Sequence, residues 1–384
     1  MSPLQPRLAH PGFSVPSHPF HLAFHPEEQL LAVSTVSGHI YFAPFDLENS
    51  DEPVSLHKFK PHSLSARVVE FSRSSTFLSA GADGKVVLSD LNPKKIWQSA
   101  SEEVVPINCA VFLDSASSAL ILAGDDNGLV SLFDTRAGKA PVQLFSEQSD
   151  YITSILPFSR TSLTTTLTTT LNTTSSTGGT GGTGGTSGTQ KFVVTSADAT
   201  LAVFDARKPK SPLIALSDAQ DDELCCSAFL SATTSRTVAG MTGAVITGDT
   251  RGVIGVWKKD CYGDVRDRVT VLEDQGSVEH MVSISDGRVI VAGGGGLVRC
   301  IQLYPHVEEG IVGMHENDVE GIAIDEDLGV MASADSEGQV KLWKLPGKVS
   351  KVSKDAGKGM GKGTGVARMD KKTLETQMFF DDLE

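Results

Sequence analysis

The residues of this sequence that most suggest chemistry are two glycine-rich runs, a histidine cluster and two Asp-x-Arg pairs. The run GKGMGKGTG at 357–365 resembles a phosphate-binding loop, but such a loop needs Ser or Thr after Gly-Lys, and Gly363 follows Lys362. The run AGGGG at 292–296 precedes an apolar stretch, where glycines favour a tight turn. There is neither a GxSxG elbow nor an HExxH pair. We therefore predict no catalytic residues and no enzymatic activity.

The histidine cluster consists of His18, His21 and His25 in the stretch SHPFHLAFHPE. Three histidines near a glutamate are compatible with a metal site. The same stretch alternates in polarity between flanking prolines, which favours a strand that enters the fold. Loosely spaced histidines are weak evidence for a site, so we predict no metal ion and no cofactor.

The two Asp-x-Arg pairs follow an aromatic residue in the segments Phe133-Asp134-Thr135-Arg136 and Phe204-Asp205-Ala206-Arg207. In each segment the Arg is able to hold a partner's carboxylate with two N–H groups while the Asp fixes it locally. The alternative is that Asp and Arg only pair within a turn, because short motifs often occur without function. The candidate partner-binding residues are Asp134, Arg136, Asp205 and Arg207.

These pairs belong to a repeat that recurs along most of the chain. Copies such as SAGADGKVVLSDL (79–91) and SADSEGQVKLWKL (333–345) combine small residues, an acidic or glycine turn and an alternating strand. Near the end of the strand each copy has one position, aromatic in four copies, which we use as its register mark. The register marks are residues 43, 89, 133, 204, 257, 301 and 343. The interval of 71 residues between the marks 133 and 204 contains a Thr/Gly/Ser tract of 30 residues at 161–190, and without this tract the interval is 41 residues. Intervals of about 40–45 residues are typical of four-stranded propeller blades.

Further apolar runs occur where such blades need their other strands. An innermost strand is expected before each turn, as in ARVVEFS or INCAVFL, and outer strands are expected in runs such as PVQLFS. We predict an all-β fold, a seven-bladed β-propeller over 18–345 with a disordered insertion at 161–190 in blade four. Residues 1–17 form an N-terminal segment, one part of which is a candidate closing strand for the last blade. We place Trp343 between blades and Trp97 in a more exposed outer strand.

The repeats resemble WD repeats over roughly 18–345, although the sequence contains no Trp-Asp dipeptide. This family places an Asp six residues before the Trp position, bonded to a loop His. Asp83 and Asp198 fit that position, Asn127 and Glu337 substitute, and His62 and His315 are the expected partners. No blade is expected to keep the whole network.

The first blade, HLAFHPEEQLLAVSTVSGHIYF, and the ending FFDDL after a Lys-rich stretch resemble the WD repeat-containing protein fifty-five and fungal Jip-five family. That resemblance implies a non-enzymatic scaffold that supports ribosome biogenesis and ribosomal RNA processing. It implies a location in the nucleus and nucleolus, with a cytoplasmic pool as an option. The partners it implies are pre-ribosomal or nucleolar proteins. The alternative is a substrate receptor of a cullin ubiquitin ligase, because the Asp-x-Arg segments resemble the box with which some WD proteins engage the ligase adaptor.

Net charge limits the kind of partner that we expect, and the cysteine content indicates the compartment. The net charge is −14, yet residues 344–372 hold nine Lys/Arg against Asp355 and Asp370. An acidic propeller is a poor phosphate binder, so RNA contact is expected only weakly, through a disordered Lys/Gly-rich tail at 346–384. In that tail Phe379 and Phe380 are candidate partner-binding residues, because a disordered segment rarely carries two aromatics without a receiver. Five cysteines without a CxxC pair favour a reducing compartment, and we expect no signal sequence, membrane contact or small-molecule substrate.

Overall fold

A computed structural model of the chain describes residues 3–49, 54–73, 76–92, 94–100, 103–113, 119–158, 190–230, 243–272, 276–284 and 287–346. The predicted insertion lies outside these residues except for Gln190, and the predicted tail lies outside them except for Pro346. Phe379 and Phe380 are therefore outside the described part as well. No helix in the described ranges is both long enough and apolar enough to cross a bilayer.

The described strands form seven antiparallel sheets of four strands each, and consecutive strands along the chain are neighbours in all but one sheet. The innermost strands are β2 (Pro19–Phe24), β6 (Ala66–Phe71), β10 (Ile107–Phe112), β14 (Ile152–Pro157), β18 (Leu224–Phe229), β22 (Val278–Ser283) and β26 (Val319–Asp325). The second strands are β3 (Leu30–Thr35), β7 (Thr76–Gly81), β11 (Leu120–Asp125), β15 (Lys191–Ser196), β19 (Val245–Asp249), β23 (Arg288–Gly293) and β27 (Val330–Asp335).

The third and outer strands complete each sheet. The third strands are β4 (Ile40–Pro44), β8 (Val86–Asp90), β12 (Val130–Asp134), β16 (Leu201–Asp205), β20 (Val253–Trp257), β24 (Leu297–Gln302) and β28 (Gln339–Lys344). The outer strands are β5 (His57–Phe59), β9 (Lys95–Gln98), β13 (Gln143–Phe145), β17 (Leu213–Leu216), β21 (Asp267–Thr270), β25 (Val307–Met314) and β1 (Leu8–Ser14). Every register mark from the sequence lies at the fourth or fifth residue of a third strand.

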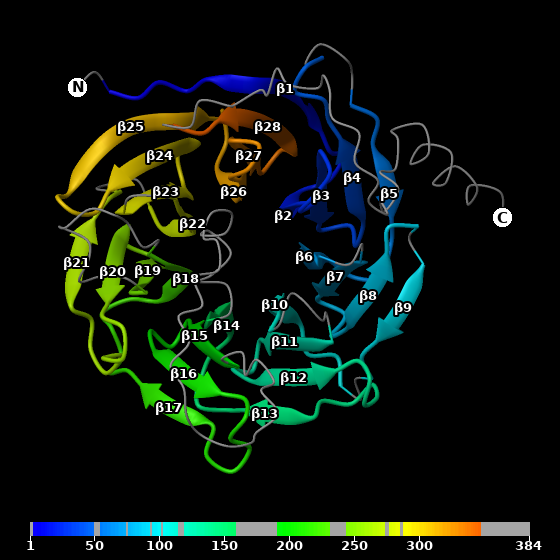
Figure 1. The fold of residues 1–384 in the computed structure, drawn as a ribbon, viewed down its shortest axis with the longest axis vertical. Coiled ribbons are helices and arrows are strands. Elements are labelled where there is room, and N and C mark those ends of the chain that lie inside the picture. Colours follow the sequence, from blue (N-terminus) through cyan, green and yellow to red (C-terminus); the bar gives the residue numbers. More distant parts are fainter. Residues whose placement is uncertain are drawn as a thin grey trace, which may run out of the picture.

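The seven sheets stand around a common axis like the blades of a propeller, with the innermost strands nearest the centre (Figure 1). The predicted all-β, seven-bladed fold is therefore confirmed. We number the blades one to seven from the sheet that begins with β2 to the sheet that begins with β26.

The hydrophobic core is divided among the spaces between neighbouring blades. One cluster joins Ile246 and Val256 of blade five to Val289 and Ile301 of blade six, and all four side chains are at most 1% exposed. The six other clusters are comparable in composition. Because one blade has two apolar faces, its burial depends on both neighbours, which is why the repeat must close into a ring.

Tight turns between second and third strands seat each blade on the loop that follows it. At the fifth residue before the register mark, six blades have glycine with a φ between +70° and +85°, for example Gly38 and Gly338. A Cβ on Gly38 would lie 2.4 Å from the carbonyl oxygen of Leu64, in the loop that leads into blade two. Blade four has Ala199 at this position with a φ of 64°, an unfavourable conformation for a residue with a Cβ. We call the side of the ring that carries these turns and the loops between blades the turn face.

The N-terminal strand β1 is the outer strand of blade seven. It runs antiparallel to β28, with Leu8 opposite Trp343 and Phe13 opposite Val340. Just before it, the backbone N–H of Leu4 donates to the carbonyl of Glu309 in β25 at 2.7 Å. The first residues of the chain therefore hold blades six and seven together, and the ring closes through segments from opposite ends of the sequence.

Trp97 lies in the outer strand β9 and is more exposed than Trp343, as predicted, but the difference is small, at 9% against 5%. Its ring packs edge to face on Phe133 with ring centres 5.6 Å apart. Its indole N–H donates to the carbonyl of Gly138 at 2.7 Å. The loop of blade three therefore folds over this strand and covers most of the ring.

Candidate interaction sites

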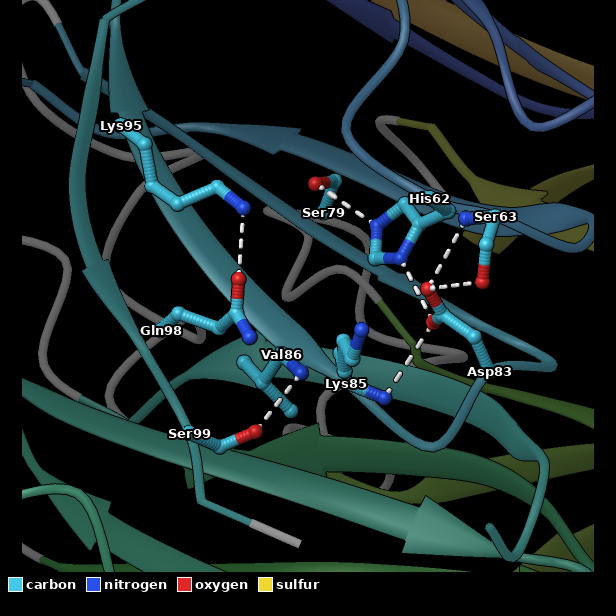
Figure 2. A network of polar contacts seen from close by, with 9 residues as sticks. All are labelled: His62, Ser63, Ser79, Asp83, Lys85, Val86, Lys95, Gln98 and Ser99. Atoms are coloured by element: carbon cyan, nitrogen blue, oxygen red, sulfur yellow. Dashed lines mark hydrogen bonds and ion pairs between the residues drawn. The ribbon is translucent and has the colours of Figure 1, made fainter.

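The polar network of blade two is centred on a buried histidine (Figure 2). His62 Nδ1 lies 2.8 Å from Asp83 Oδ1, and His62 Nε2 lies 3.0 Å from Ser79 Oγ. The second carboxylate oxygen of Asp83 accepts the backbone N–H of Ser63 at 3.0 Å. Burial alone would raise the pKa of Asp83, but the hydrogen bond from His62 and the backbone donors lower it overall. The network thus fixes the loop between blades one and two to the turn of blade two.

Blade seven contains a more complete version of this network. His315 Nδ1 lies 3.1 Å from Asp335 Oδ2, and His315 Nε2 lies 2.6 Å from Ser333 Oγ. The indole N–H of Trp343 donates to the same Ser333 hydroxyl at 2.8 Å. Two expectations are therefore wrong: one blade does keep the whole network, and its acid is Asp335 rather than Glu337.

The turns contain a second acidic position that was not predicted from the sequence. Asp125, Asp249 and Asp335 lie eight residues before their register marks, and the Oδ1 atom of each accepts two backbone N–H groups of its own turn at 2.8–3.1 Å. In blade three Asp125 has this role in place of Asn127. The available signal was the small residue followed by Asp at the end of each second strand, as in AGD, TGD and SAD.

The combination of Asp, His and Ser in blades two and seven invites comparison with a hydrolase triad. His62, Asp83 and Ser79 are at most 4% exposed, and so are Asp335 and Ser333, while His315 is 6% exposed. A nucleophile that no substrate can reach does no chemistry, so these groups stabilise the blades.

The three N-terminal histidines contact three separate partners. His18 Nδ1 bonds the carbonyl of Ser336, and its Nε2 lies 3.6 Å from a carboxylate oxygen of Glu320. His21 Nδ1 bonds the carbonyl of Val69 at 2.9 Å. His25 Nδ1 accepts backbone N–H groups that follow it in the chain. In the described residues no group of three or more His, Cys, Asp or Glu is placed to hold a metal ion.

The Asp of each Asp-x-Arg pair is the last residue of the third strand of blade three or four, and the Arg lies in the loop that follows, on the face opposite the turn face. Arg136 donates from Nε and Nη2 to the two oxygens of Asp134 at 2.9 and 2.8 Å. Arg207 holds Asp205 at the same two distances. These hydrogen bonds lower the pKa of both Asp residues, so each carboxylate is charged.

This geometry sets what the two arginines are able to do. Each guanidinium already presents its Nε and Nη2 edge to its own Asp, as the turn-pairing interpretation expects. The Arg136 side chain is 70% exposed and that of Arg207 is 43% exposed, so their outer edges face solvent. A partner carboxylate would meet a fixed but partly neutralised cation at each position.

The chain is similar in sequence to several WD-repeat proteins. It is 27% identical over 273 residues to an uncharacterized WD repeat-containing protein of Schizosaccharomyces pombe, a match of 69% of this chain and 65% of the relative. It is 25% identical to the WD repeat-containing protein 55 homolog of Drosophila persimilis, over 89% of this chain and 59% of the relative. It is 24% identical to the WD repeat-containing protein JIP5 of Cryptococcus neoformans, over 84% of this chain and 78% of the relative.

The matched region spans less than two thirds of the fission yeast and fly relatives. No family model matches the chain.

Proposed function

We propose that the chain, which is similar in sequence to the WD repeat-containing protein 55 and JIP5 proteins, is a scaffold of the nucleolus that supports ribosome biogenesis and ribosomal RNA processing. A WD-repeat propeller is a protein-interaction platform, and the nucleolar assignment is the step that we add. The observation that supports a scaffold best is the burial of the polar network. Its His, Asp and Ser side chains are buried and hold the turns of the blades in place, so they are not available for chemistry. The loops at both faces of the ring are the parts that partners are able to contact.

The proposed partners are pre-ribosomal or nucleolar proteins, and the Lys-rich segment after Pro346 adds weak contact with RNA. In this proposal Phe379 and Phe380 serve as a short hydrophobic anchor at the end of that segment. A single short peptide binds modestly, but attachment to a ring that binds the same particle raises its effective concentration.

The first experiment is affinity purification of the tagged full chain from cells, followed by mass spectrometry, with a nucleolar marker imaged in parallel. We expect recovery of pre-ribosomal proteins and an altered level of ribosomal RNA precursors on depletion. Phe379→Ala with Phe380→Ala should reduce that recovery several-fold. Lys-to-Gln changes across 348–372 are the matched control, and if these alone abolish recovery, the segment acts by charge and the aromatic anchor is wrong.

The second candidate function is substrate reception for a cullin ubiquitin ligase, and the exposed Arg136 and Arg207 favour it. Arg136→Glu with Arg207→Glu should abolish capture of the ligase adaptor under this function and leave pre-ribosomal association intact under the nucleolar one. Lys139→Glu with Lys210→Glu reverses charge in the same loops and controls for a general electrostatic effect. Adaptor capture that survives the double Arg change excludes the second function.

A further inference from the structure

Four consecutive blades each present one large apolar residue on the turn face. These residues lie in the turns or loops of blades one to four and are 48%, 51%, 69% and 39% exposed; they are Val36, Leu64, Val104 and Tyr151. The turns and loops that carry them interlock, since Gly38 is seated on the backbone of Leu64 and Gly84 on the backbone at Val104 and Val105. Large apolar side chains that gather at one exposed region are typical of an interaction site.

The turn face is most acidic in blades five to seven, where its carboxylates are Asp221, Asp222, Glu223, Asp249, Glu279, Asp318 and Glu320. Blades three and four add the exposed acids Glu103, Asp126, Glu147 and Asp150 to the same face. Only limited positive charge opposes the carboxylates of blades five to seven in the described residues: Arg251 pairs with Asp222 at 2.9 Å, and His18 lies 3.6 Å from Glu320. Burial raises the pKa of Glu320, and Glu279 and Asp318 add to this rise, against the effect of His18. A cationic ligand would relieve the repulsion among these groups.

The chain itself contains a segment with the complementary order of properties. Residues 347–372 hold eight Lys/Arg against Asp355 and Asp370. Met378, Phe379 and Phe380 follow, and the last four residues are DDLE. Around the turn face, the carboxylates of blades five to seven are followed by the exposed apolar residues of blades one to four, and blade two also presents Lys60 and Lys85.

We propose that residues 347–384 dock in cis on the turn face of their own propeller. The Lys/Arg of 347–372 contact the carboxylates of blades five to seven, and Phe379 and Phe380 cover Val36, Leu64, Val104 and Tyr151. The final carboxylates then approach Lys60 and Lys85. This inference goes beyond the proposed scaffold function, because it gives Phe379 and Phe380 a binding site on their own ring as an alternative to a site on a partner.

The length and starting point of the segment are compatible with docking on the turn face. The described chain ends at Pro346 on the opposite face, where the Pro346 carbonyl lies 3.5 Å from Arg288 Nη1. The 32 residues between Pro346 and Phe379 extend to at most on the order of 100 Å, which is enough to pass the rim of a small domain.

The opposite face is a poor seat for the basic part, because its loops carry cations of the same sign in blades two to five. These cations are Lys94, Lys95, Arg136, Lys139, Arg207, Lys208, Lys210, Lys258 and Lys259. That face also carries acids in blades one and seven, namely Glu27, Glu28, Asp46, Glu48, Asp325, Glu326 and Asp327. The basic part would therefore meet charges of both signs there, whereas the turn face offers it carboxylates and offers apolar side chains to Phe379 and Phe380.

The test is photo-cross-linking of the purified full chain with p-benzoylphenylalanine in place of Phe379. We expect a cross-linked monomer whose proteolytic fragments join residue 379 to a peptide that contains Val36, Leu64, Val104 or Tyr151. Cross-links to the outer strands β9, β13 or β17, cross-links found only in dimers, or no cross-link to the ring would each overturn the proposal. Because no nucleolar partner is present, this result is independent of the proposed function.

Charge variants sharpen the test. Glu223→Lys, Glu279→Lys and Glu320→Lys together should lower the cross-link yield at least fivefold, and 0.5 M NaCl should lower it as well because exposed charges are screened. Glu48→Lys with Asp327→Lys reverses exposed acids of the opposite face and should leave the yield unchanged. An equal loss in both variants would show that net charge, and not the turn face, governs the contact.

Discussion

Blades two and seven hold their turns with the same His, Ser and Asp chemistry but differ at the register mark. In blade seven the mark is Trp343, whose indole packs between blades and bonds Ser333. In blade two the mark is Ser89, which is fully buried and whose hydroxyl has no hydrogen-bond partner among the described residues.

The difference is compensated on the neighbouring strand. Phe77 lies directly opposite Ser89 in the sheet, and its ring packs on Phe42 of blade one with centres 5.1 Å apart. The corresponding residue opposite Trp343 is Met331. The space between blades is thus filled by the third strand in one blade and by the second strand in the other, so a weak repeat still builds a full core.

The largest expected effect comes from removing the large side chain that fills the space between blades. Trp343→Ala and Phe77→Ala should each lower the free energy of unfolding by about 3–5 kcal/mol, because both remove a large buried ring. Urea unfolding of the purified chain measures this, with Trp343→Phe as the control that keeps most of the volume. A cost below about 1 kcal/mol for Phe77→Ala would contradict the exchange of roles between strands.

Removal of the shared hydroxyl should have a smaller and unequal effect. Ser333 bonds both His315 and Trp343, whereas Ser79 bonds only His62 among the described contacts. Ser333→Ala should therefore cost about 2–3 kcal/mol and Ser79→Ala about 1 kcal/mol in unfolding free energy, since each unsatisfied buried partner adds its desolvation penalty. Equal costs would show that the indole bond contributes nothing.

The two blades should also respond to acid over different pH ranges. Burial lowers the pKa of His315 from 6.5, although Asp335 acts against this, so its contribution is complete above about pH 6.5 and is lost as pH falls through the folded pKa. The pKa of Asp83 is lowered from 3.8, so its contribution is lost only as pH falls below about 4. His315→Gln should flatten the melting temperature profile below about pH 6.5, and Asp83→Asn should flatten it below about pH 4. Interchanged ranges would refute these assignments.

The smallest effect concerns the buried hydroxyl of Ser89. Ser89→Ala removes an unsatisfied polar group and nearly preserves volume, so it should leave stability unchanged or raise it by up to about 1 kcal/mol. Ser79→Ala is the matched control, because it removes a hydroxyl that does form a hydrogen bond in the same blade. A clear destabilisation by Ser89→Ala would reveal a hydrogen bond at this hydroxyl.

The fold could be predicted from sequence because the spacing of turns and apolar strands is a property of each repeat by itself. The His62 and Asp83 contact could be predicted as well, since both residues fit a known position. Asp335 was marked only by its place at the end of a second strand, and it was missed because an Asp at either of two turn positions is able to accept the backbone N–H four residues before the register mark. The burial of Trp97 could not be predicted either, since it depends on a loop of the next blade.

The pairing of β1 with β28 has a consequence for synthesis of the chain on the ribosome. Leu8 emerges 335 residues before its partner Trp343, which takes on the order of half a minute at ~5–20 residues per second. During this time blade seven does not exist, and β1 has no native neighbour. An unpaired strand edge is a template for a neighbouring nascent chain, and Pro11 within β1 limits this hazard because proline has no backbone N–H to donate.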